Sequence, residues 1–543
     1  MCRVTMPFSL LVKTQSLGTL CNCQRLFGAN HNEDTSMNAP EKLRLENPMD
    51  VLLAPKASAE RQTEVYSALQ GLLPAHCILV REEETKPYEC DGLSMFRRVP
   101  MIVVLPETEA QVQAVLKTCH SLNVPVVARG AGTGLSGGAM PHAAGVVLGL
   151  AKLNRIIKVD QLSRTATVQP GVRNLAISDA AAAYGLYYAP DPSSQIACTI
   201  GGNVAENSGG VHCLKYGLTI HNILRVRIIS MTGELIELGS EALDASGLDL
   251  LSVFIGSEGM LGVATEVTVK LVPKPKLAQV VMASFANVDD AARAVSNVIA
   301  AGIIPAGLEM MDKKATAMVE PFVKAGYDLE AEAILLCESD GTPDEVAEEV
   351  GRMKAVFESS GATRLAVSNN EAERLRFWAG RKNAFPAAGR VSPDYYCMDG
   401  TIPRRRLGDV LNAIVAMEDK YQLRCANVFH AGDGNLHPLI LFDANDPDQL
   451  RRAEDFGAEI LELCIAVGGT VTGEHGVGLE KINQMCSQFS REELTAFLQV
   501  KAAFDPAGLL NPEKVVPTLH RCAEYGRMHV HGGKLPFVDL PRF

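Results

Sequence analysis

The sequence has little tryptophan and lacks the paired cysteines that hold metal clusters. One Trp among 543 residues leaves few platforms for stacking bases, and a formal net charge of −12 opposes binding to a phosphate backbone. The 14 cysteines never form a C-x-x-C pair, which argues against an iron–sulfur cluster and favours reduced thiols. We therefore expect no nucleic-acid partner and no cluster within this chain.

Long hydrophobic runs are also missing. No apolar run reaches the roughly 18–20 residues of a membrane span. Residues 1–32 contain basic residues but no acid, a composition that resembles a transit peptide or a weak signal peptide. A start at Met37 or Met49 explains the same stretch. Either way, we expect residues 1–50 to be an extension without a fold of their own.

The chain is long enough for two to four domains, and Pro273-Lys274-Pro275-Lys276 is its clearest linker. Before the linker, glycine-rich turns interrupt strands and two helices. Strands are expected at 101–105, 124–128, 145–150, 156–160, 165–169, 224–230, 235–238 and 264–272, and helices at 106–122 and 174–184. We assign residues 51–272 to one domain.

After the linker, strands and helices alternate, which predicts an α+β domain with an antiparallel sheet over 273–424. Strands are expected at 278–285, 303–310, 332–338 and 362–367, and helices at 288–301, 312–325, 343–359, 369–385, 407–421, 446–466 and near 490–504. Residues 425–543 form the last segment and contain the polar motifs.

A glycine-rich turn follows the strand at 124–128. Residues 129–138 (RGAGTGLSGG) contain G-x-G-x-x-G, but a Rossmann site requires a helix directly afterwards, and the next regular segment is a strand. The lysine of a P-loop is absent as well. A turn of successive small residues can instead direct its backbone N–H groups at an anion, with Thr133 and Ser136 as additional donors.

Two further segments are rich in small polar residues. Residues 190–210 (PDPSSQIACTIGGNVAENSGG) are too poor in apolar residues to pack a core, so we expect them to line a site. Glycines allow close backbone approach, and Asn and Ser offer neutral hydrogen bonds suited to a heteroaromatic ring and a polyol chain. Residues 255–263 (IGSEGMLGV) lead into a strand in a similar way.

These three segments resemble the FAD-binding domain of the vanillyl-alcohol-oxidase/p-cresol-methylhydroxylase (PCMH) flavoproteins. Within that family, the chain is similar to the branch of the bacterial glycolate oxidase D subunit and the D-lactate dehydrogenases, from about residue 50 to the end. The resemblance implies an α+β fold: a two-part PCMH-type FAD-binding domain, then an α+β substrate (cap) domain with an antiparallel sheet and a C-terminal helical return to the flavin.

The resemblance also implies non-covalent FAD, with the pyrophosphate on 129–138 and the flavin and ribityl chain between 190–210 and 256–263. The implied cofactor-binding residues are Arg129, Gly130, Gly132, Thr133, Gly134, Ser136, Gly137, Pro190, Asp191, Ser194, Gly201, Gly202, Asn203, Asn207, Ser208, Gly209, Gly210, Glu258, Gly262, Val263 and, near the C-terminus, Asn511.

Histidines and carboxylates gather in two loops of the last segment. Residues 428–438 (VFHAGDGNLHP) predict a hairpin that brings His430 and His437 together, and residues 468–478 (GGTVTGEHGVG) carry Glu474 beside His475. Two histidines and one carboxylate are a common ligand set for Zn²⁺ or a similar divalent ion. A 2-hydroxy acid could chelate such a metal through its carboxylate and hydroxyl.

Similarity to metal-dependent D-2-hydroxyacid dehydrogenases implies His430, His437 and Glu474 as ligands, His475 as the base, and Asp433 and Asn435 as supporting residues. Arg381 matches an arginine that binds the substrate carboxylate in these relatives. Cys397 occupies the place where relatives acting on 2-hydroxyglutarate have a lysine, which argues for a smaller substrate such as glycolate or D-lactate.

The main hypothesis is an FAD enzyme that oxidises glycolate or D-lactate to the 2-oxo acid. The alternatives are a D-lactate or D-2-hydroxyglutarate dehydrogenase acting alone, and a flavin-binding subunit active only in a complex. The resemblance implies an FAD-binding sister subunit and an iron–sulfur subunit. It also implies a cytoplasmic location, at the cytoplasmic face of the inner membrane, with membrane association through these partners only.

Overall fold

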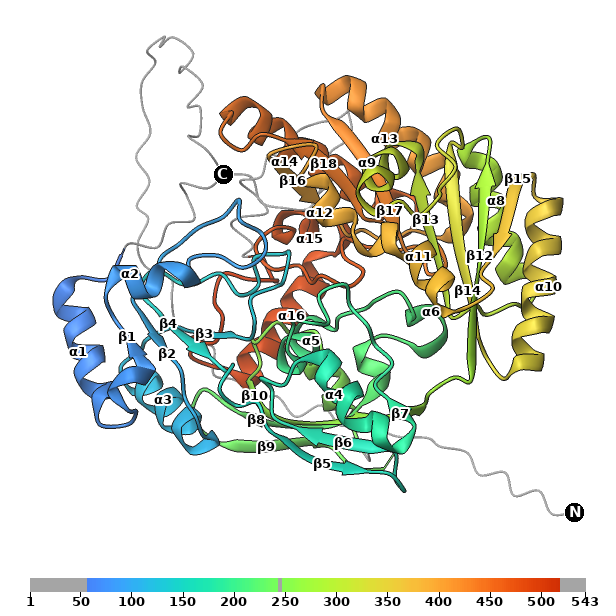
Figure 1. Cartoon of the computed structure of the whole chain (residues 1–543). Helices are drawn as coiled ribbons and strands as arrows, with labels where there is room; N and C mark the ends of the chain where they lie inside the picture. The colour runs from blue at the N-terminus through green and yellow to red at the C-terminus, as the bar shows by residue number, and fades with distance from the viewer. Residues whose placement is uncertain (1–55, 243–246, 518–543) are drawn as a thin grey trace, which may run out of the picture. The chain divides into compact units, whose positions relative to one another are not determined.

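The computed structural model describes residues 56–242 and 247–517, so the predicted extension 1–50 lies outside the described residues. A small mixed sheet in the order β1-β2-β4-β3 comes first, with β2 and β3 parallel to β4 (Figure 1). Its elements are α1 (Ala59–Gln70), β1 (Ile78–Leu79), α2 (Glu82–Thr85), β2 (Ile102–Val104), α3 (Glu109–Ser121), β3 (Val126–Arg129) and β4 (Val146–Gly149).

Helix α3 shows why this region folds as predicted. Thr108 accepts a hydrogen bond from the N–H of Gln111, and the Gln111 side chain accepts one from the N–H of Thr108, a capping box that fixes the helix start. Val112, Val115 and Leu116 then place one apolar face against the sheet, where they are fully buried.

A five-stranded antiparallel sheet in the order β5-β6-β10-β8-β9 follows. Its strands are β5 (Ile156–Asp160), β6 (Thr165–Val168), β8 (Ile223–Ile229), β9 (Leu235–Gly239) and β10 (Val263–Lys270). The accompanying elements are α4 (Asn174–Ala181), β7 (Leu186–Tyr187), α5 (Ile200–Glu206), α6 (Cys213–Tyr216), α7 (Leu250–Phe254) and β11 (Val272–Pro273), which pairs with β7.

The part after the linker contains a seven-stranded antiparallel sheet in the order β15-β12-β14-β13-β17-β18-β16. Its strands are β12 (Leu277–Phe285), β13 (Gly307–Asp312), β14 (Ala333–Gly341), β15 (Ala362–Val367), β16 (Asp394–Cys397), β17 (Arg424–Phe429) and β18 (Pro438–Phe442). Its helices are α8 (Val288–Ala300), α9 (Lys313–Val323), α10 (Pro343–Ser359), α11 (Glu371–Lys382), α12 (Ala384–Ala388), α13 (Leu407–Tyr421) and α14 (Pro447–Ala466).

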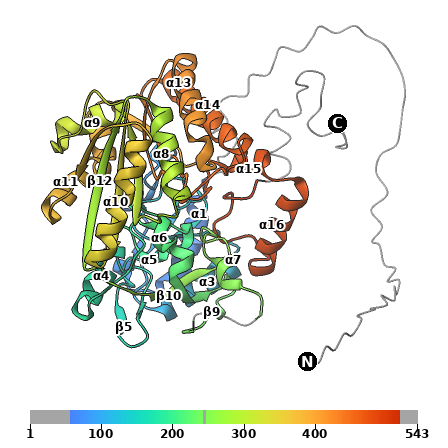
Figure 2. The same cartoon turned by 90° about the vertical axis from the view of Figure 1, so that its right-hand side faces the viewer.

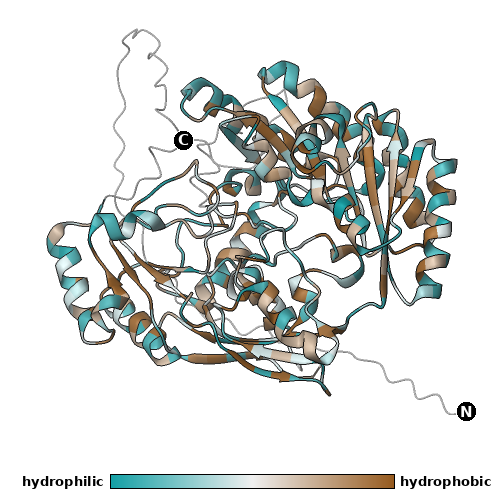
Figure 3. Cartoon of the chain, in the orientation of Figure 1, coloured by the Kyte–Doolittle hydropathy of each residue, from teal (hydrophilic) through white to brown (hydrophobic). Residues whose placement is uncertain are grey.

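Helices cover both faces of this sheet, and the side chains of strand β12 show which helices cover which face. Val280 and Met282 pack in the cluster that contains residues of α9 and α11, whereas Phe285 contacts Phe357 of α10 on the opposite face. Helices α10, α8, α13 and α14 contact one another in a row, as Figures 1 and 2 show. The inner strands of this sheet are buried over most of their length and largely hydrophobic (Figure 3), as expected for a sheet covered on both sides.

The chain then returns to the first sheet. Helices α15 (Ile482–Gln488) and α16 (Arg491–Phe504) precede a short extended stretch that runs beside β3. Val126 donates its N–H to Leu509 and accepts one from Asn511, and it pairs in parallel with Leu510. The end of the described chain therefore extends the first sheet, as the predicted helical return requires.

The structure confirms the α+β class and most predicted elements, but three expectations need correction. Part of 190–210 does pack a core, because Ile200 and Val204 of α5 are fully buried. The strand expected at 303–310 is β13 at 307–312, and the elements that were not predicted include α5, α12, α15 and β16. Nine described cysteines are free as expected, but Cys486 is disulfide-bonded. No described helix is long and apolar enough to cross a membrane.

Candidate active site

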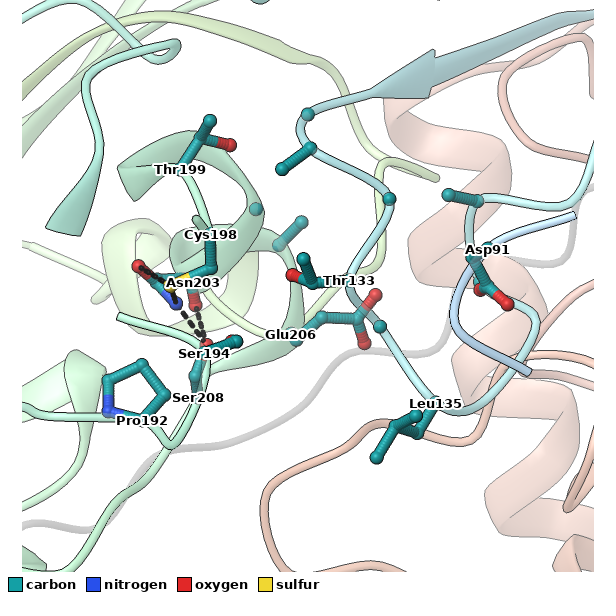
Figure 4. A pocket seen from close by; sticks show the side chains of 18 of the residues that line it. Asp91, Thr133, Leu135, Pro192, Ser194, Cys198, Thr199, Asn203, Glu206 and Ser208 are labelled. Atoms are coloured by element: carbon teal, nitrogen blue, oxygen red, sulfur yellow. Dashed lines mark hydrogen bonds between the residues drawn. The ribbon is translucent and has the colours of Figure 1, made fainter. Parts of the chain in front are cut away.

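The glycine-rich segments meet around a cavity of about 520 Å³, within the usual range for a small-molecule site. Figure 4 shows the turn that carries Thr133 facing the segment of Thr199 and Asn203. The predicted cofactor residues that line the cavity are Arg129, Gly130, Gly132, Thr133, Gly134, Ser194, Gly201, Gly202, Asn203, Ser208, Glu258, Gly262 and Val263.

The local geometry explains the small residues in this wall. A Cβ at Gly130 would overlap the Thr199 hydroxyl, and Gly132 has a φ of +71°, which disfavours other residues. The buried Thr199 Oγ1 makes no hydrogen bond within 56–242 and 247–517. A wall of backbone amides with an unpaired hydroxyl fits the polar, flexible part of a dinucleotide cofactor.

The other predicted cofactor residues do not line this cavity; they are Ser136, Gly137, Pro190, Asp191, Asn207, Gly209, Gly210 and Asn511. Several instead hold the loops in place. The Asn511 side chain donates to the carbonyls of Gly138 and Glu258, and the Asn207 side chain accepts from the N–H of Ile220. The Asp191 carboxylate is occupied by His212.

Two acidic residues of the cavity wall were missed by the sequence analysis. Asp91 and Glu206 both line the cavity, and each has a buried carboxyl oxygen with no hydrogen bond to the described residues. Burial raises the pKa of Asp91 to about 6 and raises that of Glu206 well above its usual value. Glu206 lies within the glycine-rich segment, so a charged residue in a run of small ones was the available signal.

The hairpin predicted at 428–438 forms between β17 and β18 and brings the two histidines together. The rings of His430 and His437 are 5.1 Å apart, and the Nε2 atom of each lies 3.2 Å from Oε1 of Glu474. Neither ring nitrogen of His437 makes a hydrogen bond with the described residues. Three ligand atoms that converge in this way, from two buried histidines and the partly buried Glu474, fit a divalent cation.

A second trio, Asp399, His437 and His475, also has ligand atoms close together. Asp399 is already occupied: it accepts the N–H groups of residues 473–475, the Thr472 hydroxyl and the Lys481 ammonium. Lys481 holds the pKa of Asp399 well below its usual range despite burial. Asp399 therefore anchors the loop that carries Glu474 and His475, and the first trio is the better metal site.

His475 stands at the cavity wall beside the cluster. Its ring stacks on that of His437 with centroids 4.8 Å apart, and its buried Nδ1 atom has no hydrogen-bond partner in the described residues. Burial lowers the pKa of His475 to about 4, so the imidazole is neutral at neutral pH and can accept a proton.

Arg381 lies behind the cluster and does not line the cavity, whereas its neighbour Lys382 does. Arg381 Nε donates to Oε2 of Glu309 at 2.5 Å, and Oε1 of Glu309 lies 2.6 Å from His430 Nδ1. Arg381 Nη2 is 3.4 Å from His430 Nε2, so its guanidinium edge still points toward the histidine cluster. Glu309 on β13 was not predicted, because nothing in the sequence pairs it with His430.

Of the two supporting residues, Asp433 is exposed at the turn of the hairpin. Its carboxylate accepts the N–H of Asn435. Asn435 pairs through its backbone with Thr401 and His430, and its buried Oδ1 atom has no partner in the described part of the chain. Both residues therefore shape the loop beside the histidine cluster.

Ionic contacts join the cavity walls to the large sheet. His212 bridges Asp191, at 2.8 Å from Nδ1, and Glu338 of β14, at 3.1 Å from Nε2. Glu338 also accepts from Arg374 and Trp378. The partly exposed His212 side chain therefore connects the glycine-rich segment to the sheet that carries the histidine cluster.

Two family models match the chain. The FAD binding domain model covers residues 100–239, and the model of the C-terminal domain of FAD linked oxidases covers residues 274–515. The chain also has the fold of p-cresol methylhydroxylase, with a TM-score of 0.71, 17% identity, and coverage of 85% of this chain and 98% of that one. Fold and site therefore define an FAD-linked oxidoreductase with a PCMH-type architecture.

Named relatives place the chain more narrowly. It is 61% identical to the glycolate oxidase subunit GlcD of Escherichia coli K12, over 89% of this chain and 97% of GlcD. Identity is 39% to GlcD of Bacillus subtilis and 31% to a D-lactate dehydrogenase of Anaerostipes hadrus, over 79% and 81% of this chain and 91% and 94% of theirs. The chain belongs to the family of the glycolate oxidase D subunit, and it is an FAD-linked hydroxyacid oxidoreductase.

Proposed function

We propose that this chain oxidises glycolate or D-lactate to the 2-oxo acid with FAD bound non-covalently in the cavity. Residues 51–272 hold the cofactor through the lining residues named above, residues 273–424 cap the substrate, and residues 425–543 supply the reacting groups. When bound, FAD supplies a two-electron acceptor. The backbone turn at 129–134 binds its phosphates, and Asn203 and Ser208, joined by a 2.8 Å hydrogen bond, face its polar chain.

His430, His437 and Glu474 bind a divalent metal, Zn²⁺ or a similar ion. Such an ion acts as a Lewis acid toward the hydroxyl and carboxylate of a 2-hydroxy acid. Support comes from the two histidine Nε2 atoms that face one carboxylate oxygen, and from the Glu309 contact that orients His430. Asp399 keeps Glu474 in place by accepting its backbone N–H.

His475 removes the proton of the substrate hydroxyl at Nδ1. Arg381, which lies outside the cavity wall, receives the substrate carboxylate through the guanidinium edge that points toward the histidine cluster. The observation that carries this proposal is the position of a neutral, buried histidine at the junction of the cofactor cavity and the histidine cluster. Cys397 is buried in β16, where 2-hydroxyglutarate relatives have a lysine, and this favours a monocarboxylic substrate.

The partners are proposed by likeness alone. GlcD carries the name of an oxidase subunit, so we propose an FAD-binding sister subunit and an iron–sulfur subunit as the route for electrons out of this chain. A dehydrogenase that acts alone is the second candidate, because the D-lactate dehydrogenase of Anaerostipes hadrus is similar over 94% of its length.

Anaerobic mixing of the purified protein with glycolate or D-lactate tests the proposal. We expect either acid to bleach the flavin absorbance, and His475→Gln to slow bleaching at least about 100-fold without loss of flavin. His120→Gln, at an exposed position of α3, is the matched control and should bleach normally. A yellow protein that neither acid reduces with Zn²⁺ present contradicts the substrate assignment, and normal bleaching by His475→Gln contradicts the base assignment.

A further inference from the structure

The carboxyl group of Glu206 occupies a space between two glycine loops. Glu206 is the last residue of α5 and lines the cavity. A Cβ at Gly138 would lie 2.8 Å from its Oε1 atom, and a Cβ at Gly476 would overlap Oε2. Gly138 belongs to the turn of the first half, whereas Gly476 follows His475. Glycine at both positions leaves room for this carboxyl where the two parts of the site meet.

The surroundings of Glu206 are unfavourable for a negative charge. Its Oε2 atom is buried and has no hydrogen-bond partner in residues 56–242 and 247–517. The charges that act on it most strongly are those of three acids, Glu258, Asp91 and Asp399. The ammonium of Lys481 acts in the opposite sense, but it is itself hydrogen-bonded to Asp399. Burial, followed by the charge of Glu258, raises the pKa of Glu206 well above its usual value.

A neutral carboxylic acid at this place has an O–H group that can donate a hydrogen bond and needs an acceptor. Glu258 accepts the N–H groups of Val477 and Gly478, and no hydrogen bond joins it to Glu206 in residues 56–242 and 247–517. Figure 4 shows the Glu206 carboxyl in the cavity region, near the turn of Thr133. The acceptor is therefore supplied by the molecule that fills the cavity.

We propose that Glu206 is a neutral hydrogen-bond donor to an acceptor atom of the flavin ring and thereby raises the reduction potential of the bound flavin. The inference rests on the proposed function for the presence of FAD in this cavity and for the place of its ring beside His475. The partner is the flavin ring and not the adenine end. Gly476 lies against the Glu206 carboxyl and directly follows His475 in the chain, and His475 is where the substrate meets the flavin. Reduction adds electron density to the ring, and a donor stabilises that density more than it stabilises the oxidised ring.

Two substitutions separate a neutral donor from an anion. Gln keeps the size and an N–H donor but cannot carry a charge, whereas Leu removes the donor. The midpoint potential of the bound flavin is measured by anaerobic dye titration of the holoenzyme. We expect Glu206→Leu to shift the equilibrium toward oxidised flavin by tenfold or more, about 30 mV for a two-electron couple, and Glu206→Gln to stay within about threefold of the parent.

The sign of the Gln effect decides the protonation state. If Glu206 were an anion, Glu206→Gln would remove a negative charge and raise the potential, which would overturn the proposal. An unchanged potential in Glu206→Leu would overturn it as well. Because the titration uses neither substrate nor metal, failure of this inference is distinct from failure of the glycolate, D-lactate or metal assignments.

A second measurement tests the proposal without the Glu206→Leu variant, in case that variant fails to fold. Infrared spectra of the parent holoenzyme should contain the carbonyl band of a protonated carboxylic acid, and Glu206→Gln should lack it. Glu82→Gln, at an exposed position of α2, is the matched control and should keep the band. If the spectrum of Glu206→Gln keeps every carboxylic-acid band of the parent, the proposal is overturned.

Discussion

Glu309 joins Arg381 and His430 through the two oxygens of one buried carboxylate. Oε2 accepts Arg381 Nε at 2.5 Å, and Oε1 lies 2.6 Å from His430 Nδ1, so the Nε2 atom of His430 is left facing Glu474. The charges of His430 and Arg381 keep the pKa of Glu309 below its usual value although burial opposes this. Glu309 therefore fixes the tautomer and direction of one proposed metal ligand.

Glu309→Gln is expected to weaken Zn²⁺ binding by about 10- to 100-fold, because His430 loses the carboxylate that orients it. Competition with a chromophoric chelator measures the affinity. Glu332→Gln is the control, since Glu332 is paired with the half-exposed Lys313. Unchanged affinity in Glu309→Gln would show that the contact has no role in metal binding.

Lys481→Met should destabilise the fold by roughly 3–5 kcal/mol, because it leaves the fully buried Asp399 without its cation. Urea unfolding followed by circular dichroism gives the change. Lys420→Met removes a cation whose partner Glu459 is partly exposed, and it should have little effect. A loss as small for Lys481→Met as for Lys420→Met would contradict the importance of this pair.

Gly209→Ala should separate cofactor binding from oxidation. The added Cβ would overlap Oε2 of Glu474 and displace that carboxylate, whereas Gly209 does not line the cavity. We expect flavin content to stay normal and the oxidation rate to fall about 100-fold. Gly351→Ala in α10, where a Cβ meets nothing within 4 Å, should leave both unchanged. Equal rates in the two variants would argue against a role for Glu474.

His212→Gln should cost more stability at pH 6 than at pH 10. Burial opposes protonation, but Asp191 and Glu338 together raise the pKa of His212 well above its usual value. Its stabilisation is therefore complete below the unfolded pKa of about 6.5 and is lost as pH rises through the higher folded pKa. The pKa of Glu338 is lowered to about 2, so its contribution persists at pH 6.

Denaturation midpoints of the parent and His212→Gln across this pH range provide the measurement. The difference between the two proteins should narrow as the pH rises. A difference that stays constant or widens would show that the His212 contacts act without charge.

The sequence predicted the elements whose pattern is local. The helices expected at 106–122 and 343–359 and the strands after the linker follow from spacing and turn residues, and the structure adds the capping boxes that fix the starts of α3 and α10. The hairpin of His430 and His437 was predictable because its two strands are adjacent in sequence. Helix α5 was not, since its apolar residues Ile200 and Val204 are separated by glycine and asparagine.

Contacts between distant segments could not be predicted. Asp399 precedes the loop that it anchors by more than 70 residues, and Glu309 lies 121 residues before His430. No pattern in a single sequence indicates that residues so far apart are in contact. Asp91 likewise reaches the cavity from a segment without a glycine motif. Family resemblance supplied the ligand set, but only the three-dimensional arrangement revealed the residues behind it.

The pairing of Val126 with Leu510 determines when, during synthesis of the chain, the cavity wall can be completed. The cavity wall includes residues from Asp91 to His475, and Asn511 ties the turn at Gly138 to Glu258. During synthesis from the amino terminus, the ribosome must release nearly the whole described chain before this wall is complete. We therefore expect a chain truncated before residue 509 to hold flavin less well, because the pairing of Leu510 with Val126 and the contacts of Asn511 that fix the cavity wall would be missing.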